Sequence, residues 1–324
     1  MKKKAVVVLA VFLLLAFVLA LLVAQPILLR PAKRVVPAAD AQRLRTHVAT
    51  LSKDFSPRDW EHSGNLERAS KYITEEFARA GAQTGEQVYQ VDRRLYHNVI
   101  ARFGPETRQS IVVGAHYDTF AGLPGADDNA SGVSGLLELA SLLSKTQLPM
   151  RVELVAFTLE EPPIFRSDSM GSMQHARQLK EQGAQLRAMI SLEMIGYFSD
   201  ARNSQRYPIP GLSLIYGDRG NFITVAGRFA DESLVRRVKR AMTSANDLPV
   251  HSINATANIA GIDFSDHLSY WQHGYPAVMI TDTAFYRNQN YHEAGDTVDT
   301  LDYRRMAQVV EQVYAAILEL ADRP

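Results

Sequence analysis

The pattern of hydrophobic positions begins with an unbroken apolar segment near the start of the chain. Residues 5–24 are twenty consecutive nonpolar residues that follow three lysines at positions 2–4. As a helix, such a segment rises about 30 Å, which matches the hydrocarbon core of a bilayer. We therefore expect residues 1–29 to form a transmembrane signal-anchor. A cleavable signal peptide is the alternative, since Ala20 or Ala24 could precede a cut, although its apolar stretch is usually shorter, about 7–15 residues.

The charges that flank this segment do not fix its orientation. Three lysines precede it, and Arg30, Lys33 and Arg34 follow it, so the positive-inside rule favours neither direction. The very short tail before the apolar run favours export of the large C-terminal part. We expect residues 30–40, which contain two prolines, to form a short stalk. Residues 41–324 should then lie outside the cytoplasm, on the periplasmic side of a bacterial inner membrane.

The remainder of the chain alternates between helical and strand-like patterns. Apolar residues at helical spacing, such as Leu66, Ile73 and Phe77, predict an amphipathic helix over 64–81. The same reasoning predicts further helices at 131–144, 171–182, 231–245 and 303–321. Short apolar runs predict strands at 98–103, 110–115, 152–159, 189–192 and 277–281. This alternation is typical of the α/β class, with a mixed, mostly parallel central sheet and helices on both faces.

One stretch, residues 199–262, breaks this rhythm because it is rich in Gly, Pro and Asn. We interpret part of it as an irregular excursion near the functional site. Residues 41–324 are therefore expected to form one catalytic domain.

Composition narrows the possible functions. The chain has 324 residues, 46% of them hydrophobic, which is enough to bury a large core. Its 35 basic and 35 acidic residues leave no net charge to attract nucleic acid, so we expect no nucleic-acid partner. There is no cysteine, and any metal must therefore be held by His, Asp and Glu.

Polar residues of this kind follow several predicted strands. His116 and Asp118 come directly after the strand at 110–115, where the carboxylate can accept the second ring N–H of a metal-bound imidazole. A single His at a strand end is more often structural. Asp127 and Asp128 precede a predicted helix, where a cap or a turn is the simpler interpretation.

Three further fragments complete the pattern. Glu160 and Glu161 follow the strand at 152–159, Glu193 follows the strand at 189–192, and His292 lies in a polar loop before the last helix. Parallel strands place their functional residues at their carboxyl ends, so these side chains should meet. Two imidazoles and several carboxylates without thiolates are typical of a two-metal centre.

These segments resemble the co-catalytic zinc exopeptidases, which include bacterial leucyl aminopeptidases and plasma glutamate carboxypeptidase. The resemblance covers about residues 64–303, and its motifs begin at Gly114, Gly125, Glu160, Leu192, Ser265 and Tyr291. It implies the phosphorylase/hydrolase-like fold of that family and two Zn²⁺ ions per chain.

The resemblance also implies a role for each residue. Asp128 bridges the two ions, His116 and Glu193 complete the site of one ion, and Glu161 and His292 complete the site of the other. Many relatives have Asp where this chain has Glu193, which puts the spacing and identity of the metals in question more than their binding.

The remaining roles concern residues beside the ions. Glu160 is the expected general base, and Asp118 is expected to orient His116. Tyr291 is the candidate to stabilise the oxyanion, with Tyr197 as the alternative. Asp127 is assigned to the turn and His267 to the surroundings of the ligands. The other histidines lack such context and are expected to be structural or exposed; they are His47, His62, His97, His175, His251 and His273.

The reaction implied is hydrolysis of peptide substrates at a chain terminus. An aminopeptidase is the expected type, while Arg166, Arg219 and Arg287 keep a carboxypeptidase open, because a carboxylate is recognised by Arg or Lys. A glutaminyl cyclase-like acyltransferase with a single zinc is a further alternative. A non-catalytic ectodomain would be expected to have lost ligands, and every expected ligand position here holds a competent residue.

Overall fold

The computed structural model describes residues 4, 11, 18 and 20–322. In this part of the chain, no helix has both the length and the apolar character needed to cross a membrane. Most of the predicted spanning segment, residues 5–24, lies outside the described residues.

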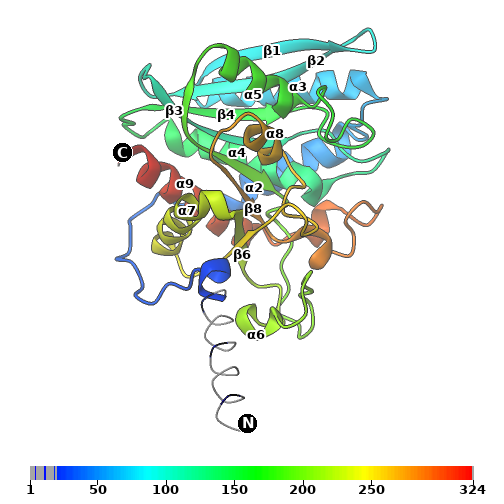
Figure 1. Ribbon diagram of the computed structural model, residues 1–324. Coiled ribbons are helices and arrows are strands. Elements are labelled where there is room, and N and C mark those ends of the chain that lie inside the picture. Colours follow the sequence, from blue (N-terminus) through cyan, green and yellow to red (C-terminus); the bar gives the residue numbers. More distant parts are fainter. Residues whose placement is uncertain (1–3, 5–10, 12–17, 19, 323–324) are drawn as a thin grey trace.

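A single eight-stranded sheet forms the centre of the described structure (Figure 1). Its strand order is β1-β2-β4-β3-β5-β8-β6-β7. Four neighbouring strands in the middle, β4, β3, β5 and β8, are parallel to one another. The β1-β2 hairpin pairs antiparallel with β4 at one edge, and β6 pairs antiparallel with β8 near the other. The strands are β1 Gln83–Val91, β2 Arg94–Phe103, β3 Gln109–His116, β4 Arg151–Phe157, β5 Gln185–Glu193, β6 Ile223–Arg228, β7 Val250–Ala255 and β8 Ala277–Thr281.

Helices cover both faces of this sheet. Helices α2, α3, α4, α7 and α9 pack on one face, and α5 and α8 pack against each other on the opposite face. Their bounds, with that of the short helix α6, are α2 Ala41–Ala49, α3 Ser63–Arg79, α4 Gly132–Leu143, α5 Gly171–Glu181, α6 Ser213–Tyr216, α7 Glu232–Ala245, α8 His267–Gln272 and α9 Tyr303–Asp322. The prediction of a mixed α/β sheet covered on both sides is confirmed.

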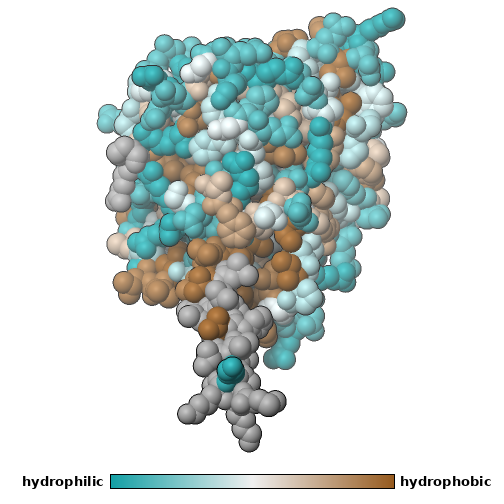
Figure 2. Space-filling model, viewed as in Figure 1, coloured by the Kyte–Doolittle hydropathy of each residue, from teal (hydrophilic) through white to brown (hydrophobic). Residues whose placement is uncertain are grey.

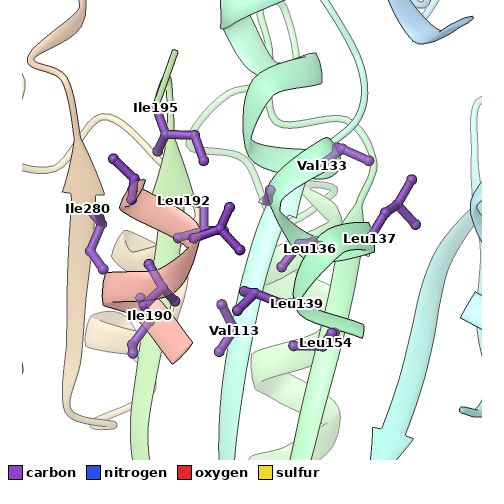
Figure 3. Close-up of a cluster of buried hydrophobic side chains, with 14 of the residues drawn as sticks. Val113, Val133, Leu136, Leu137, Leu139, Leu154, Ile190, Leu192, Ile195 and Ile280 are labelled. Atoms are coloured by element: carbon purple, nitrogen blue, oxygen red, sulfur yellow. The ribbon is translucent and has the colours of Figure 1, made fainter. Parts of the chain in front are cut away.

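The apolar character of the middle strands explains this layering. Val113 of β3, Leu154 of β4 and Ile190 of β5 are fully buried, and they pack against Leu136 and Leu139 of α4 (Figure 3). Strands that are buried on both faces need apolar residues at successive positions, which is the pattern of a covered parallel sheet. This packing holds the carboxyl ends of β3, β4 and β5 side by side.

All five predicted strands and all five predicted helices are present, with small differences at their ends. Three strands, β1, β6 and β7, were not predicted. The edge strand β1 is largely polar and half-exposed, and β7 contains His251, Ser252 and Asn254. The stretch 199–262 is irregular only in part, because β6, α7 and β7 lie within it and extend the sheet.

Residues 30–40 run along the surface of the domain. The backbone N–H of Arg34 donates to the carbonyl of Ser244, and its guanidinium pairs with Glu319 at 3.1 Å. Asp40 caps α2 by accepting from the backbone N–H groups of Gln42 and Arg43. The segment expected to be a stalk is therefore tied to the domain at Arg34 and joined to α2 through Asp40.

Candidate metal centre

The carboxyl ends of three neighbouring strands bring the predicted site residues together. His116 ends β3, Glu160 and Glu161 follow β4, and Glu193 ends β5. Asp128 lies in the turn before α4, and His292 lies in the loop between β8 and α9. The four acids and His116 are almost completely buried, with exposed fractions of 1–6%. Because β4, β3 and β5 are neighbouring parallel strands, their carboxyl ends bring these side chains together at one edge of the sheet.

These side chains form two groups that share Asp128. In one group, Nε2 of His116 lies 3.4 Å from Oδ1 of Asp128 and 3.3 Å from Oε2 of Glu193. In the other, Nε2 of His292 lies 3.2 Å from Oδ2 of Asp128 and 3.3 Å from Oε2 of Glu161. Each oxygen of the Asp128 carboxylate therefore faces a different imidazole. This is the pairing that the family resemblance implied.

The electrostatics of the cluster favour bound cations. Burial and the neighbouring Asp128 raise the pKa of Glu161 to about 7, and burial raises the pKa of Glu160 well above its ordinary value. Burial alone would lower the pKa of His292, but its hydrogen bonds to Asp128 and Glu161 raise it to about 10. Buried carboxylates at this density need positive charge beside them, because an uncompensated buried charge is costly.

Asp118 organises the acid pair on the neighbouring strand. Its Oδ1 accepts from the backbone N–H of Glu160 at 3.1 Å, and its Oδ2 accepts from that of Glu161 at 3.0 Å. Nδ1 of His116 lies 3.2 Å from the carbonyl oxygen of Asp118 and 3.5 Å from its Oδ1. The nearer of these two oxygens belongs to the backbone, whereas the sequence pointed to the carboxylate, which instead fixes the turn that carries Glu160 and Glu161.

Asp296, which the sequence reasoning missed, does the same for the other acid pair. Its two carboxylate oxygens accept from the backbone N–H groups of Asp127 at 2.8 Å and Asp128 at 3.0 Å. Asp127 accepts from the backbone N–H of Gly196 and from the side chain of Asn288, which fits its assignment to the turn. Its position four residues after the predicted ligand His292 could have indicated that Asp296 lies near the site.

Arg58 is a second residue that the sequence did not single out. Its side chain is fully buried and donates to the carbonyl oxygens of Leu51, Tyr117, Pro124 and Gly125. Burial lowers its pKa to about 10. Arg58 ties together the loops on either side of Asp118, so it supports the centre through the backbone.

Aromatic and hydroxyl groups complete the surroundings of the ligands. The Tyr291 ring stacks on His292 with ring centroids 3.9 Å apart. The backbone of Tyr197, the alternative, bonds to Asp282 and Arg287. Ser265 donates a 2.7 Å hydrogen bond to Oε2 of Glu193.

His267 has a different role from the one predicted. Its Nε2 pairs with the carbonyl of Ile262, and its ring packs edge-on against Trp271. In this motif it is Ser265, two residues earlier, that contacts a predicted ligand, because the turn before α8 directs the Ser265 hydroxyl toward β5 and the imidazole away from it.

The other histidines lie apart from the cluster. His47 and His175 bond to the hydroxyl groups of Tyr72 and Tyr270, His62 and His97 lie beside Asp59 and Glu86, and His273 bonds to the Ser269 carbonyl. His251 differs from these five, because its side chain lines the cavity beside the predicted metal ligands. No feature of the sequence around His251 signalled this position.

That cavity has a volume of about 790 Å³, including its open mouth, and its lining is mostly apolar. Glu193 and Tyr291 line it on the side of the metal ligands, and Leu212 and Tyr216 of the α6 region line it elsewhere. The arrangement places the acid-rich cluster beside an apolar pocket.

A comparison with protein families identifies the family of this chain. The model of peptidase family M28 matches residues 98–317, which is more than half of the chain and includes every predicted ligand. The chain belongs to peptidase family M28. The expectation of a zinc exopeptidase of this class is thereby confirmed.

Individual relatives of this M28 peptidase agree with the family. The uncharacterized protein YfbL of Escherichia coli K12 is 49% identical over 283 residues, covering 85% of this chain and 87% of YfbL. Leucine aminopeptidase 1 of Ajellomyces capsulatus is 27% identical, covering 89% of this chain and 73% of that protein. The structure of BSAP, a zinc aminopeptidase from Bacillus subtilis, has the same fold, with a TM-score of 0.71 and 14% identity over 90% of this chain and 97% of BSAP.

The residues of this M28 peptidase fit zinc. Donor atoms of His116, Asp128 and Glu161 all lie within 4.8 Å of one another. Oε1 of Glu161 is buried and has no hydrogen-bond partner, so it is free to accept a cation. Imidazole and carboxylate donors are ordinary zinc ligands.

Proposed function

We propose that this M28 peptidase is an aminopeptidase that holds two zinc ions per chain. The observation that carries the proposal is the Asp128 carboxylate, whose two oxygens each face a separate imidazole. In this assignment Asp128 bridges the ions, His116 and Glu193 hold one, and Glu161 and His292 hold the other. The single-zinc centre of a glutaminyl cyclase-like enzyme would need only one of these two groups.

The chemistry divides between the ions and the protein. When bound, the two ions activate water and polarise the carbonyl of the scissile bond. Glu160 is the general base, because its Oε2 lies 3.9 Å from Nε2 of His116, beside the proposed ligands. Its pKa, raised by burial, suits a group that takes a proton from water and passes it to the leaving amine. Tyr291 stands beside His292, where its hydroxyl can donate to a developing oxyanion.

The charges around the cavity favour a free amino terminus. The cavity reaches Glu193, so the carboxylates of the centre meet whatever enters it. The guanidinium of Arg166 pairs with Asp263 at 2.6 Å, and that of Arg287 is buried against Gln205. Neither arginine lines the cavity, whereas the exposed Arg206 does. The apolar lining favours substrates whose terminal residue has a large apolar side chain.

The decisive experiment compares two glutamate variants of the purified full chain. Glu160→Gln should keep its zinc and lose turnover of leucyl anilides by about 10³-fold, within the range for loss of a general base. Glu293→Gln, which changes an exposed glutamate beside His292, should keep both. Undiminished turnover in Glu160→Gln would remove that residue from its role.

Substrate panels test the type of reaction. Release of amino acids from the carboxyl end of peptides, lost on Arg206→Ala, would identify a carboxypeptidase. Cyclisation of glutaminyl peptides with one zinc per chain would identify the acyltransferase. Cleavage of aminoacyl anilides and free-amino peptides, but not of N-acetylated ones, is the result expected here.

We also propose that residues 1–29 anchor the enzyme in a membrane, with residues 41–324 outside the cytoplasm of a bacterium. The twenty-residue apolar run supports the anchor, and because the flanking charges are balanced, the orientation is left to the protease experiment below. In cells that express the full chain, the protein should sediment with membranes and resist extraction by carbonate. External protease should digest residues 41–324 in spheroplasts. Release of the chain by carbonate would contradict the anchor.

A further inference from the structure

Exposed apolar side chains gather at one end of the molecule. Leu28 and Leu29 are 87% and 81% exposed, and Leu214 of α6 is 91% exposed. Ile209 and Ile215 beside it are also exposed. Figure 2 shows hydrophobic residues at the lower end of the molecule, where α6 lies in Figure 1. We call these five residues the basal surface.

A shared support holds the two parts of the basal surface together. The buried ammonium of Lys239 donates to the carbonyl oxygens of Ala24 and Gln25 at 2.8 and 2.9 Å. Ser252 of β7 donates to the same carbonyl of Ala24, and its own carbonyl accepts from the hydroxyl of Tyr216 in α6. The end of the N-terminal segment and α6 are therefore bonded to one residue of the sheet. Their relative position is set by the fold.

Positive charge borders this surface. Arg236 and Arg240 are exposed and line a shallow hollow together with Leu22, Leu28 and Leu29. Glu232 also lines this hollow and pairs with Arg236 at 3.2 Å, which leaves a net positive charge beside the apolar side chains. Such a border suits the boundary between acyl chains and anionic headgroups, where each basic residue near the surface contributes about 1 kcal/mol. The apolar run at 5–24 ends where this surface begins, so the two form one continuous apolar region along the sequence.

We propose that the basal surface docks on the lipid bilayer, with Leu214 and Ile215 of α6 inserted among the acyl chains. This inference rests on the proposed membrane anchor. Because Leu212 and Tyr216 of the same segment line the apolar cavity, docking places one wall of the cavity against the membrane. The catalytic centre then has one fixed orientation instead of swinging on a tether.

The absence of cysteine makes this surface directly testable. Full-length chains with Leu214→Cys, Leu29→Cys or Leu95→Cys can each be labelled with an environment-sensitive fluorophore. They are then reconstituted into vesicles of phosphatidylcholine and phosphatidylglycerol that contain spin-labelled lipid. Leu95 is the matched control, because it is a leucine of 61% exposure on the β1-β2 hairpin, at the opposite end of the molecule (Figure 1).

The expected result is lipid quenching at positions 29 and 214 that is severalfold greater than at position 95, with the reverse order for quenching by aqueous iodide. Quenching at 29 with a water-exposed label at 214 would overturn the docking surface and leave the anchor standing. Water exposure at both positions would also overturn the docking surface, and only release of the chain by carbonate would overturn the anchor as well. Peptidase activity of the same samples in detergent reports on the metal centre separately.

A second copy of the chain is the other possible occupant of this surface. In that case, oxidation of unlabelled Leu214→Cys chains would give a disulfide-linked dimer in high yield, and Leu95→Cys chains would stay monomeric. That outcome would contradict the assignment to lipid. A low and equal yield at both positions supports it.

Discussion

The metal centre and the apolar cavity are adjacent regions built in different ways. Most of the proposed ligands come from strand ends or from the turn before α4, and His292 comes from the loop between β8 and α9. Asp118 and Asp296 fix the backbone of the two acid pairs with paired hydrogen bonds. The cavity, by contrast, is lined mainly by loops, including residues 205–208, 259–264 and 283–286. The chemistry is therefore held by the sheet, while the choice of substrate is left to segments that can change without disturbing it.

The largest effect is expected when one of the proposed metal ligands is removed. His292→Ala should lower the zinc content from two ions to one per chain. Turnover should fall by more than the roughly 100-fold lost when only an outer contact is removed. His62→Ala is the control, because His62 is also an imidazole beside a carboxylate, 2.7 Å from Asp59, without a second metal-type donor set. Metal analysis of both variants checks the count, and two retained ions in His292→Ala would refute the assignment.

A smaller effect is expected where an acid acts only through the backbone. Asp296→Asn replaces one acceptor of the pair by an N–H group that faces the backbone N–H of Asp127 or Asp128. We expect kcat to fall by about 10- to 100-fold, as for other supports of metal ligands, with a lower affinity for zinc. Asp299→Asn, at an exposed acid paired with Arg45, should behave as the wild type. Equal kinetics of the two variants would show that Asp296 has no part in positioning the centre.

Filling the cavity tests the other region. Ala226→Leu adds volume at a lining position on β6. It should lower kcat/KM by about 10-fold for leucyl and phenylalanyl substrates and less for alanyl ones, since steric discrimination of this kind is worth 1–3 kcal/mol. Ala255→Leu is the matched control, because Ala255 belongs to the same buried cluster and is absent from the cavity lining. A uniform loss over all substrates, or loss of zinc, would mean that the two regions are not separable.

The smallest effect on activity is expected at a histidine outside both regions. Burial, followed by the charge of Arg102, lowers the pKa of His175 to about 3. As the pH falls below 6.5 the unfolded chain binds this proton first, so the contribution to stability is complete above pH 6.5 and declines toward pH 3. Between pH 6.5 and 5 the loss is about 2 kcal/mol at 1.36 kcal/mol per unit.

His175→Asn should remove that slope and leave turnover at neutral pH unchanged. Chemical denaturation at pH 7, 6 and 5, monitored by tryptophan fluorescence, measures the free energy of unfolding at each pH. An identical pH dependence in the variant would assign the acid sensitivity to other groups, such as the buried His47, whose pKa is lowered to about 4 chiefly by burial.

The sequence predicted the strands whose apolar pattern leads directly to a polar residue of the candidate site. Strands β3 and β5 are apolar runs that end in His116 and Glu193, and Glu160 follows the apolar run of β4, so pattern and chemistry pointed to the same edge of the sheet. Strands β1 and β7 were missed because they carry polar residues at sheet positions that neighbouring elements cover only partly. Their assignment needs tertiary contacts.

Supporting residues were harder to foresee than ligands. Asp296 and Arg58 act on backbone N–H and carbonyl groups, which every residue possesses, so their partners leave no signature in the sequence. Ser265 could be confused with its neighbour His267, because the direction of each side chain depends on the turn before α8. The apolar cavity arises where several separate loops meet, and no single loop predicts it.

The attachment of the N-terminal segment to Lys239 bears on the maturation of the enzyme. The carbonyl of Ala24, a residue that could precede a signal-peptidase cut, accepts from both Lys239 and Ser252, and Ala24 is only 6% exposed. A processing protease must draw that backbone into its own active site, which the completed fold prevents. If a signal peptidase cuts after Ala24, the cut must therefore come before this segment packs onto Lys239 and Ser252.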